Sequence, residues 1–497
     1  MIGMPSILQA LAPLWIVAGS SVLVLLADAL LMRIGDVDKD RGLSGLKGSL
    51  LSALTGFVLL VALAIAALNF EYEPRLIATP ASMLVVDSQA SFAMTLLCAG
   101  ALLTLWVSLG ALSEVKLHFG EFYPLLLFSL AGALAVVCAA NLIMLFFAME
   151  LMSLPFYVLA GFDRDRKQSN QAGRDAFVSG GFSSAFSLYG IALIYGATGH
   201  FDYPGIREAI DSGGGLLFAG AALLLVGMLT RISVFPFHQW SLGVASGAPT
   251  ATLIFIPFAV FGASAFALTR MFDTLNVAEL GNLRLTFTVL AAVSMLAGAV
   301  MALRENNVKR LLAYAAVAHA GFLLVALCVS GSEGRFAAIL EVSTFVVMQA
   351  GVLAVVAAIS TIHNRWESIG DYNGLAAKRP IIAGAMMVLL LALAGVPGTS
   401  GFVSRMSLLT VSIGDGQIVL TIIMGLSSIV LFAAYLRIAT AMYIRTAHGG
   451  TATSPPFMAV VAIGVCVVVT LYLGIFPGEG PLAFDFLELV RRAANAS

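Results

Sequence analysis

The chain has 497 residues, of which 60% are hydrophobic and 11% are charged, and its mean hydropathy is +0.99. Globular proteins carry about 25% charged residues, so this composition excludes a soluble protein and indicates a polytopic membrane protein. The net charge is −1 and no block of like charges occurs, so nothing suggests a nucleic-acid partner. Membrane lipid is therefore the expected main partner.

Fourteen apolar stretches are candidate membrane spans when the sequence is read with a window of about 19 residues. Open strands cannot satisfy their backbone in lipid, so an all-α fold with about fourteen transmembrane helices is predicted. The first stretch lacks the flanks of a cleaved signal and is expected to be a retained span. In chain order the spans lie near residues 9–31, 50–69, 89–112, 121–139, 142–161, 172–198, 214–237, 248–270, 283–303, 309–330, 336–361, 381–412, 417–444 and 456–476.

Lysine and arginine are distributed unevenly between the loops. Loops after odd-numbered spans hold sixteen of them, and loops after even-numbered spans hold five. The positive-inside rule places the odd loops in the cytoplasm and both termini on the opposite side, although Arg491 and Arg492 run against it.

Two of the spans are interrupted. The seventh contains Pro236 within residues 234–238, and the twelfth contains Pro397 and Gly401 within residues 395–401. Proline removes a helix hydrogen bond and glycine relaxes the backbone, so each site frees carbonyls that can hold an ion or water. The breaks are five spans apart, and this odd offset predicts two inverted repeats. The alternative interpretation is that both breaks only kink helices for packing.

The predicted division of the chain follows from these repeats. It comprises an N-terminal three-helix segment (1–112), a first repeat with spans four to eight (113–275), a second, inverted repeat with spans nine to thirteen (276–446), and a C-terminal helix and tail (447–497).

Several charges lie where lipid-facing sequence carries none. Glu150 falls inside the fifth span, Arg231 just before the first break and Arg405 just after the second. An ionisable group at membrane depth costs roughly 2.5–3.5 kcal/mol even on the lenient insertion scale, so such residues mark an ion pathway or a coupling site. Glu341 and Asp28 also lie in apolar spans, and each is either a relay or a charge near a helix end.

The four cysteines lie singly in apolar stretches without metal-ligand spacing. They are expected to serve packing, and neither a metal site nor a disulfide is predicted from them.

Motifs between about residues 120 and 445 form one ordered series. It runs from Glu-Leu-Met-Ser-Leu-Pro at 150–155 through Pro-Phe-His at 236–238 and Gly-Ala-Pro-Thr at 247–250 to the segments 309–321 and 393–402. The series resembles subunit N of the proton-pumping NADH:quinone oxidoreductase, respiratory complex I. The resemblance implies an antiporter-like subunit of the membrane arm, beside sister antiporter-like subunits in a bacterial inner membrane, with both termini in the periplasm.

The resemblance also implies a function. Such a subunit contributes to proton translocation coupled to electron transfer from NADH to quinone. It has no cofactor, metal or redox centre of its own, and FMN, iron–sulfur clusters and quinone are expected in partner subunits.

The family's proposed pathway uses a span-five glutamate, buried lysines and a histidine. Glu150 matches the glutamate, but the lysine positions hold Asp175, Arg231, Phe261 and Arg405. A buried lysine can take up and release a proton, whereas arginine keeps its charge in proteins. The two arginines are therefore expected to polarise their neighbours without passing protons.

A second departure concerns the stretch after Pro-Phe-His. Where the family writes Thr-Pro-Asp-x-Tyr-Glu, residues 241–246 read Ser-Leu-Gly-Val-Ala-Ser, and Gln171 replaces a glutamate of the span-six motif. The acidic side chains of this region of the family are therefore missing from their usual positions.

The remaining candidates for the polar axis are two histidines and a lysine. Histidine titrates near neutral pH, which suits a relay. His319 shares the tenth span with Lys309 and is expected to be a relay, whereas His238 either relays protons or orients the broken seventh span. The full predicted axis is Glu150, Arg231, His238, Lys309, His319, Glu341 and Arg405.

Three functions are compatible with these features. The first is a proton-translocating subunit of a complex I-type enzyme. The second is a structural paralogue that no longer pumps, which the missing lysines suggest. The third is a subunit of an Mrp-type cation/proton antiporter, against which the subunit N motifs argue.

Overall fold

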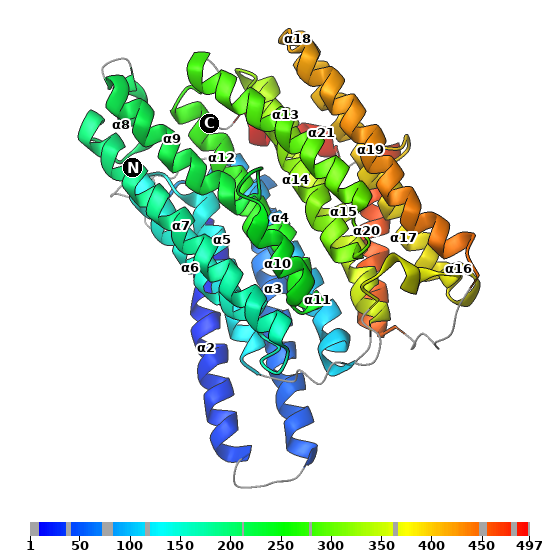
Figure 1. Cartoon of the computed structure of the whole chain (residues 1–497). Helices are drawn as coiled ribbons and strands as arrows, with labels where there is room; N and C mark the ends of the chain where they lie inside the picture. The colour runs from blue at the N-terminus through cyan, green and yellow to red at the C-terminus, as the bar shows by residue number, and fades with distance from the viewer. Residues whose placement is uncertain are drawn as a thin grey trace.

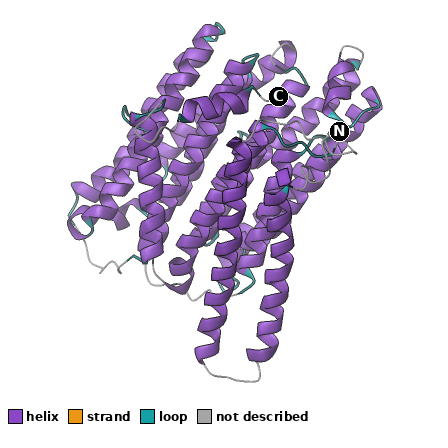
Figure 2. Ribbon diagram, turned by 180° about the vertical axis from the view of Figure 1, so that it is seen from behind, coloured by secondary structure: helices purple, strands orange, loops and turns teal. Residues whose placement is uncertain are grey.

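The computed structural model describes residues 9–35, 41–71, 83–114, 120–210, 213–277, 281–360, 366–446, 455–478 and 485–495. Helices dominate these ranges, as the two views in Figures 1 and 2 show, and no strand longer than an isolated bridge occurs in them. The predicted all-α fold class is confirmed.

The long helices run roughly parallel to one another in Figure 1. In chain order they are α2 (Ala12–Gly35), α3 (Arg41–Glu71), α4 (Ser88–Glu114), α5 (Phe122–Cys138), α6 (Leu142–Ala160), α7 (Lys167–Thr198), α9 (Gly214–Arg231), α13 (Gly281–Arg304), α14 (Val308–Leu327), α15 (Ser332–Ile359), α17 (Pro380–Ala394), α18 (Ser400–Gly414), α19 (Ile418–Tyr443) and α20 (Phe457–Ile475).

Shorter elements connect or extend these helices. They are α8 (Tyr203–Glu208), α10 (Gln239–Gly247), α11 (Thr250–Ile256), the π-helix η2 (Pro257–Gly262), α12 (Ala263–Thr274), η3 (Ile369–Tyr372), α16 (Leu375–Lys378) and α21 (Phe486–Ala494).

Twelve helices of the described ranges are long and apolar enough to cross a membrane. They coincide with twelve of the fourteen expected spans, with α11, η2 and α12 forming one continuous helix. The other two expected spans, 121–139 and 381–412, contain the shorter apolar helices α5, with 17 residues, and α17, with 15. The chain is therefore a multi-span membrane protein, with two of its expected spans shorter than the usual length of about 20 residues.

Both predicted helix breaks are present. The first separates α9, which ends at Arg231, from α10, and the second separates α17 from α18. Gly395 ends α17 with φ 82°, a left-handed conformation that suits glycine. A Cβ on Gly401 would lie 1.9 Å from the carbonyl oxygen of Ala392, so only glycine lets the two half-helices approach so closely.

A third irregularity was not predicted. The expected span 248–270 contains the π-helix η2, which begins at Pro257. Proline cannot donate the backbone hydrogen bond of a regular turn, and a π-turn is one way to accommodate it.

The helices α6 and α14 begin at asparagine caps. The side chain of Asn141 accepts a hydrogen bond from the backbone nitrogen of Met144 at 2.7 Å, and that of Asn307 accepts one from Arg310 at 3.1 Å. Asparagine is a preferred residue at this position because it satisfies an otherwise unpaired helix N–H. These caps set the starts of the two helices that carry Glu150 and His319.

Helices from both halves of the chain meet around α10 and α15. The short α10 packs against α7 and also against α14, while α15 packs against α11, α14, α17, α18 and α20. Nearly every residue of α15 is buried. Glu341, Phe345 and Gln349 follow one another at intervals of four along α15, so all three lie on one face.

Candidate functional site

Four polar side chains from three helices form a first cluster. Glu150 and Ser153 lie one turn apart on α6, Ser184 lies on α7, and Arg231 is the last residue of α9. The Arg231 Nη2 atom is 3.0 Å from Glu150 Oε1, and Nη1 donates a hydrogen bond to Ser153 Oγ. The Ser184 hydroxyl also donates to Glu150 Oε1, so this carboxylate oxygen accepts from both sides.

The two charges of the first cluster are buried to different degrees. The Arg231 side chain is 6% exposed and that of Glu150 is 26% exposed. Arg231 also lies at the carboxyl end of α9, where unpaired carbonyls carry negative partial charge. The guanidinium is thus balanced by a carboxylate and a helix end, while the carboxylate keeps partial access to the outside of the chain.

Three side chains form a second cluster in the other half of the chain. His319 Nδ1 on α14 is 2.6 Å from Glu341 Oε1 on α15, and the Ser404 hydroxyl on α18 donates to Glu341 Oε2. The side chains of His319 and Glu341 are 2% and 5% exposed. The His319 ring stacks on Phe345 with ring centroids 4.4 Å apart. This cluster is fully enclosed.

Arg405 lies beside the second cluster on α18. Its guanidinium carbon is 3.6 Å from the centre of the Phe322 ring, a cation–π contact. Its Nε atom lies 3.8 Å from where a Cβ on Gly395 would stand, at the carboxyl end of α17. Nε and Nη1 have no hydrogen-bond partner among the described residues. Arg405 is therefore held by an aromatic ring and a helix end, and no ion pair within the described chain holds it.

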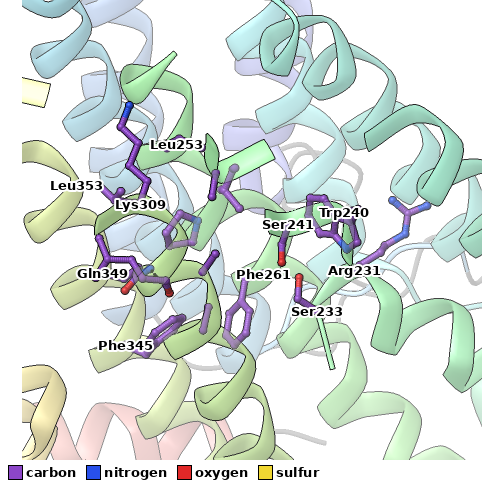
Figure 3. A pocket seen from close by; sticks show the side chains of 16 residues that line it. Arg231, Ser233, Trp240, Ser241, Leu253, Phe261, Lys309, Phe345, Gln349 and Leu353 are labelled. Carbon is purple, nitrogen blue, oxygen red and sulfur yellow. Dashed lines mark hydrogen bonds between the residues drawn. The ribbon is translucent and has the colours of Figure 1, made fainter. Parts of the chain in front are cut away.

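A cavity of about 70 Å³ lies between the clusters. Figure 3 shows Arg231 at one end of it and Lys309, Phe345 and Gln349 at the other. The cavity is roomy enough for several waters, since one water needs roughly 10–15 Å³ of such volume. The Gln349 Oε1 atom is buried without a partner in the described chain, and it offers a water an acceptor.

A smaller cavity of about 20 Å³ lies between α7 and α9. Arg231, Ser153 and Ser179 contribute polar atoms to its lining. Trp240 forms part of the wall of both cavities, and its indole Nε1 donates a hydrogen bond to the Thr230 carbonyl at 2.8 Å. Trp240 and Arg231 are thus common to the linings of the two cavities.

The remaining predicted residues lie elsewhere. His238 is in the first break, with its ring stacked on Phe235 at 5.2 Å and tilted against Tyr314 at 6.1 Å. The buried Asp28 of α2 lies against Gly120, just before α5, where a Cβ on that glycine would touch its carboxylate. Of the seven predicted axis residues, the structure brings Glu150 to Arg231 and His319 to Glu341, and it places Arg405 beside the second pair.

Several site residues were missed from the sequence. The hydroxyls of Ser153, Ser184 and Ser404 complete the two clusters, and Phe345 and Gln349 line the cavity. The spacing along α6 and α15 could have indicated Ser153, Phe345 and Gln349, because residues three or four apart share a helix face. Ser184 and Ser404 come from other helices, and nothing in the sequence pairs them with a glutamate.

Metal binding has no geometric basis in the described ranges. No group of three or more histidine, cysteine, aspartate or glutamate side chains there is placed to hold a metal ion. Cys98, Cys138, Cys328 and Cys466 are all buried and free.

The sequence matches known families over most of its length. A family described as "NADH:quinone oxidoreductase/Mrp antiporter, TM" matches residues 139–431. NADH-quinone oxidoreductase subunit N of Trichlorobacter lovleyi is 34% identical over 80% of this chain and 82% of its own length. NADH-quinone oxidoreductase subunit N 1 of Sorangium cellulosum is 36% identical, again over 80% of this chain and 82% of its own.

Solved structures share the fold. A chain of respiratory complex I from Thermus thermophilus with bound aureothin superposes with a TM-score of 0.76 at 28% identity, over 92% of this chain and 97% of that one. A chain of the Mrp complex from a Dietzia species gives a TM-score of 0.82 at 21% identity, over 99% and 97%. At that lower identity the likeness concerns the fold alone.

Proposed function

The chain belongs to the NADH:quinone oxidoreductase/Mrp antiporter family, and we propose that it is a membrane-arm subunit of a complex I-type enzyme that contributes to proton translocation. The similarity to subunit N proteins over four-fifths of the chain supports this assignment. In this proposal the subunit lies in a bacterial inner membrane beside other membrane-arm subunits, with both termini in the periplasm. FMN, the iron–sulfur clusters and quinone belong to the partner subunits.

One observation carries the proposal of proton translocation: a cavity with room for water lies between Arg231 of the first cluster and Phe345, the ring packed on His319 of the second. Arg231 lines one end, and Phe345 lines the other. Buried ionisable residues at membrane depth are costly and typically belong to proton relays or ion pathways. Glu150 and the His319–Glu341 pair are the groups that take up and release protons, and water in the cavity carries them between the clusters.

The two arginines act differently in this scheme. A guanidinium keeps its proton, so Arg231 and Arg405 do not relay. Arg231 instead forms an ion pair with Glu150 through its contact at 3.0 Å. A proton that binds Glu150 must weaken this ion pair, so proton uptake and the geometry of the broken α9–α10 segment are linked.

A structural paralogue is the second candidate. The feature that favours it is the ring of Phe345, which stacks on His319 and stands between the imidazole and the cavity, together with Phe261 at a centroid distance of 5.0 Å. If these rings stay in place, no water reaches the histidine and the second cluster only holds α14, α15 and α18 together. An Mrp-type exchanger is less well supported, because that likeness lies below 25% identity.

The test is Glu341→Gln in the intact complex in inverted membrane vesicles. The substitution keeps the size of the side chain and removes its charge, so protons pumped per electron fall while electron transfer from NADH to quinone is still measurable. The matched control is Asp28→Asn, a buried acid that lies against Gly120 instead of the cavity, which leaves the ratio unchanged. An unchanged ratio in Glu341→Gln favours the structural paralogue, and sodium-dependent exchange by the chain without redox partners favours the Mrp-type alternative.

A further inference from the structure

Asp175 is a half-buried acid that the two clusters do not include. It lies two turns into α7, and its carboxylate faces α10 at Gly243. A Cβ on Gly243 would lie 2.4 Å from Asp175 Oδ2, so the carboxylate occupies the space in which a side chain of α10 would begin. A side chain at 243 would displace the carboxylate from that space.

The Asp175 carboxylate has no stabilising partner in the described part of the chain. Within those ranges no hydrogen bond or ion pair reaches it. The neighbouring Arg174 is on the exposed side of α7. Because an unpaired carboxylate inside a membrane helix is unfavourable by a few kcal/mol, its presence there needs a reason other than stability.

A polar route leads from Asp175 to the first cluster. Ser179 and Ser183 follow it at intervals of four along α7 and therefore continue the same helix face. Both serines line the cavity of about 20 Å³, which ends at Arg231. One water fits in that volume. The cavity thus extends from Ser179, one turn beyond Asp175, to Arg231, which holds Glu150.

The direction of the route follows from the charges at the start of α7. Arg164, Arg166 and Lys167 stand at this end of the helix, and positive residues favour the cytoplasmic side. Asp175 lies between this end and the cluster, so a proton from the cytoplasm reaches Asp175 before it reaches Glu150.

We propose that Asp175 is the proton-uptake residue of the first cluster, an inference that rests on the proposed function. A proton from water at the cytoplasmic end binds the Asp175 carboxylate. The new O–H bond then breaks, and the proton passes through water beside Ser179 to the Glu150 carboxylate. Asp175 returns to its ionised form, and no other group is consumed.

The test is Asp175→Ala in the intact complex in inverted vesicles. The quantity measured is the number of protons taken up per electron transferred. We expect this substitution to remove the subunit's share of pumping. The isosteric Asp175→Asn preserves the packing against α10 and gives the same loss, which separates the loss of a titrating group from misfolding.

Supplying the carboxylate from the neighbouring helix separates a role in proton transfer from a role in packing. The double variant Asp175→Ala/Gly243→Asp brings a carboxylate into the same space from α10 and restores pumping. Full pumping in Asp175→Asn, in a complex where Glu341→Gln still loses it, would overturn this proposal and leave the proposed function intact. Failure of the double variant to recover, with normal assembly, would also overturn it. Full pumping in Asp175→Asn and also in Glu341→Gln would instead contradict the proposed function itself.

Discussion

Glu150 and Glu341 each accept a hydrogen bond from a serine of a neighbouring helix, Ser184 in one half of the molecule and Ser404 in the other. Their nitrogen partners differ. Glu150 faces the guanidinium of Arg231, which keeps its proton, whereas Glu341 faces an imidazole that can gain or lose one. The first pair therefore joins a carboxylate to a permanent cation, and the second joins a carboxylate to a side chain that can be neutral or charged.

The arginines of the two halves also differ. Arg231 balances the carboxylate directly, while Arg405 lies over the Phe322 ring and leaves Glu341 to His319. A proton can move between His319 and Glu341 without changing the net charge of the enclosed cluster, whereas a proton that binds Glu150 leaves the first cluster with a net positive charge. Uptake of a proton from outside adds one charge to either cluster, so the contrast lies in the internal transfer that only the second pair allows.

The two arginines are expected to contribute unequally to stability. Arg231→Leu leaves the Glu150 carboxylate without its cation. Loss of one partner of a buried ion pair costs about 3–5 kcal/mol, and the partial exposure of Glu150 lowers this figure. The melting temperature of the purified complex should fall clearly for Arg231→Leu. It should fall less for Arg405→Leu. The double variant Glu150→Leu/Arg231→Leu should recover part of the loss, and equal losses for both arginines would contradict the contrast between the halves.

The His319 imidazole is expected to have separable roles in stability and proton transfer. His319→Leu removes a hydrogen bond to a charged group, which is worth about 1.5–3 kcal/mol, and should lower the melting temperature by less than Arg231→Leu does. His319→Gln keeps a donor near Glu341 but cannot carry a proton, so stability should be largely retained while pumping per electron falls. Normal pumping in His319→Gln would show that the shared proton is not used.

The contact between Arg405 and Phe322 should have the smallest effect. Phe322→Leu keeps an apolar side chain and removes the ring face, with a loss of about 0.5–2 kcal/mol. The matched variant Phe156→Leu removes another buried ring, which packs edge-on against Trp240 and has no cation–π contact within the described residues. Thermal unfolding should show a larger loss of stability for Phe322→Leu than for Phe156→Leu. This difference should disappear when Arg405→Leu is also present. If the difference persists, the effect of Phe322 is due to packing alone.

Much of the fold was predictable because apolar length and proline or glycine interruptions are local properties of the sequence. Glu150, Arg231 and Arg405 were identified in the same way, since a charge within an apolar span needs no knowledge of the fold. The pair of His319 with Glu341 was not predicted, because the residues lie on different helices and helix rotation decides which faces meet. The contact of Asp175 with Gly243 was not predicted for the same reason, because it depends on how α7 and α10 pack together. The π-turn at Pro257 also depends on how α11 packs against α4 and α15.

Trp240 has a mechanical consequence. Its side chain borders both the small space beside α7 and the large space that reaches α14, and the short helix α10 that carries it touches both of those helices. Because α10 carries this shared wall, any shift of the short helix changes the shape of both cavities at once.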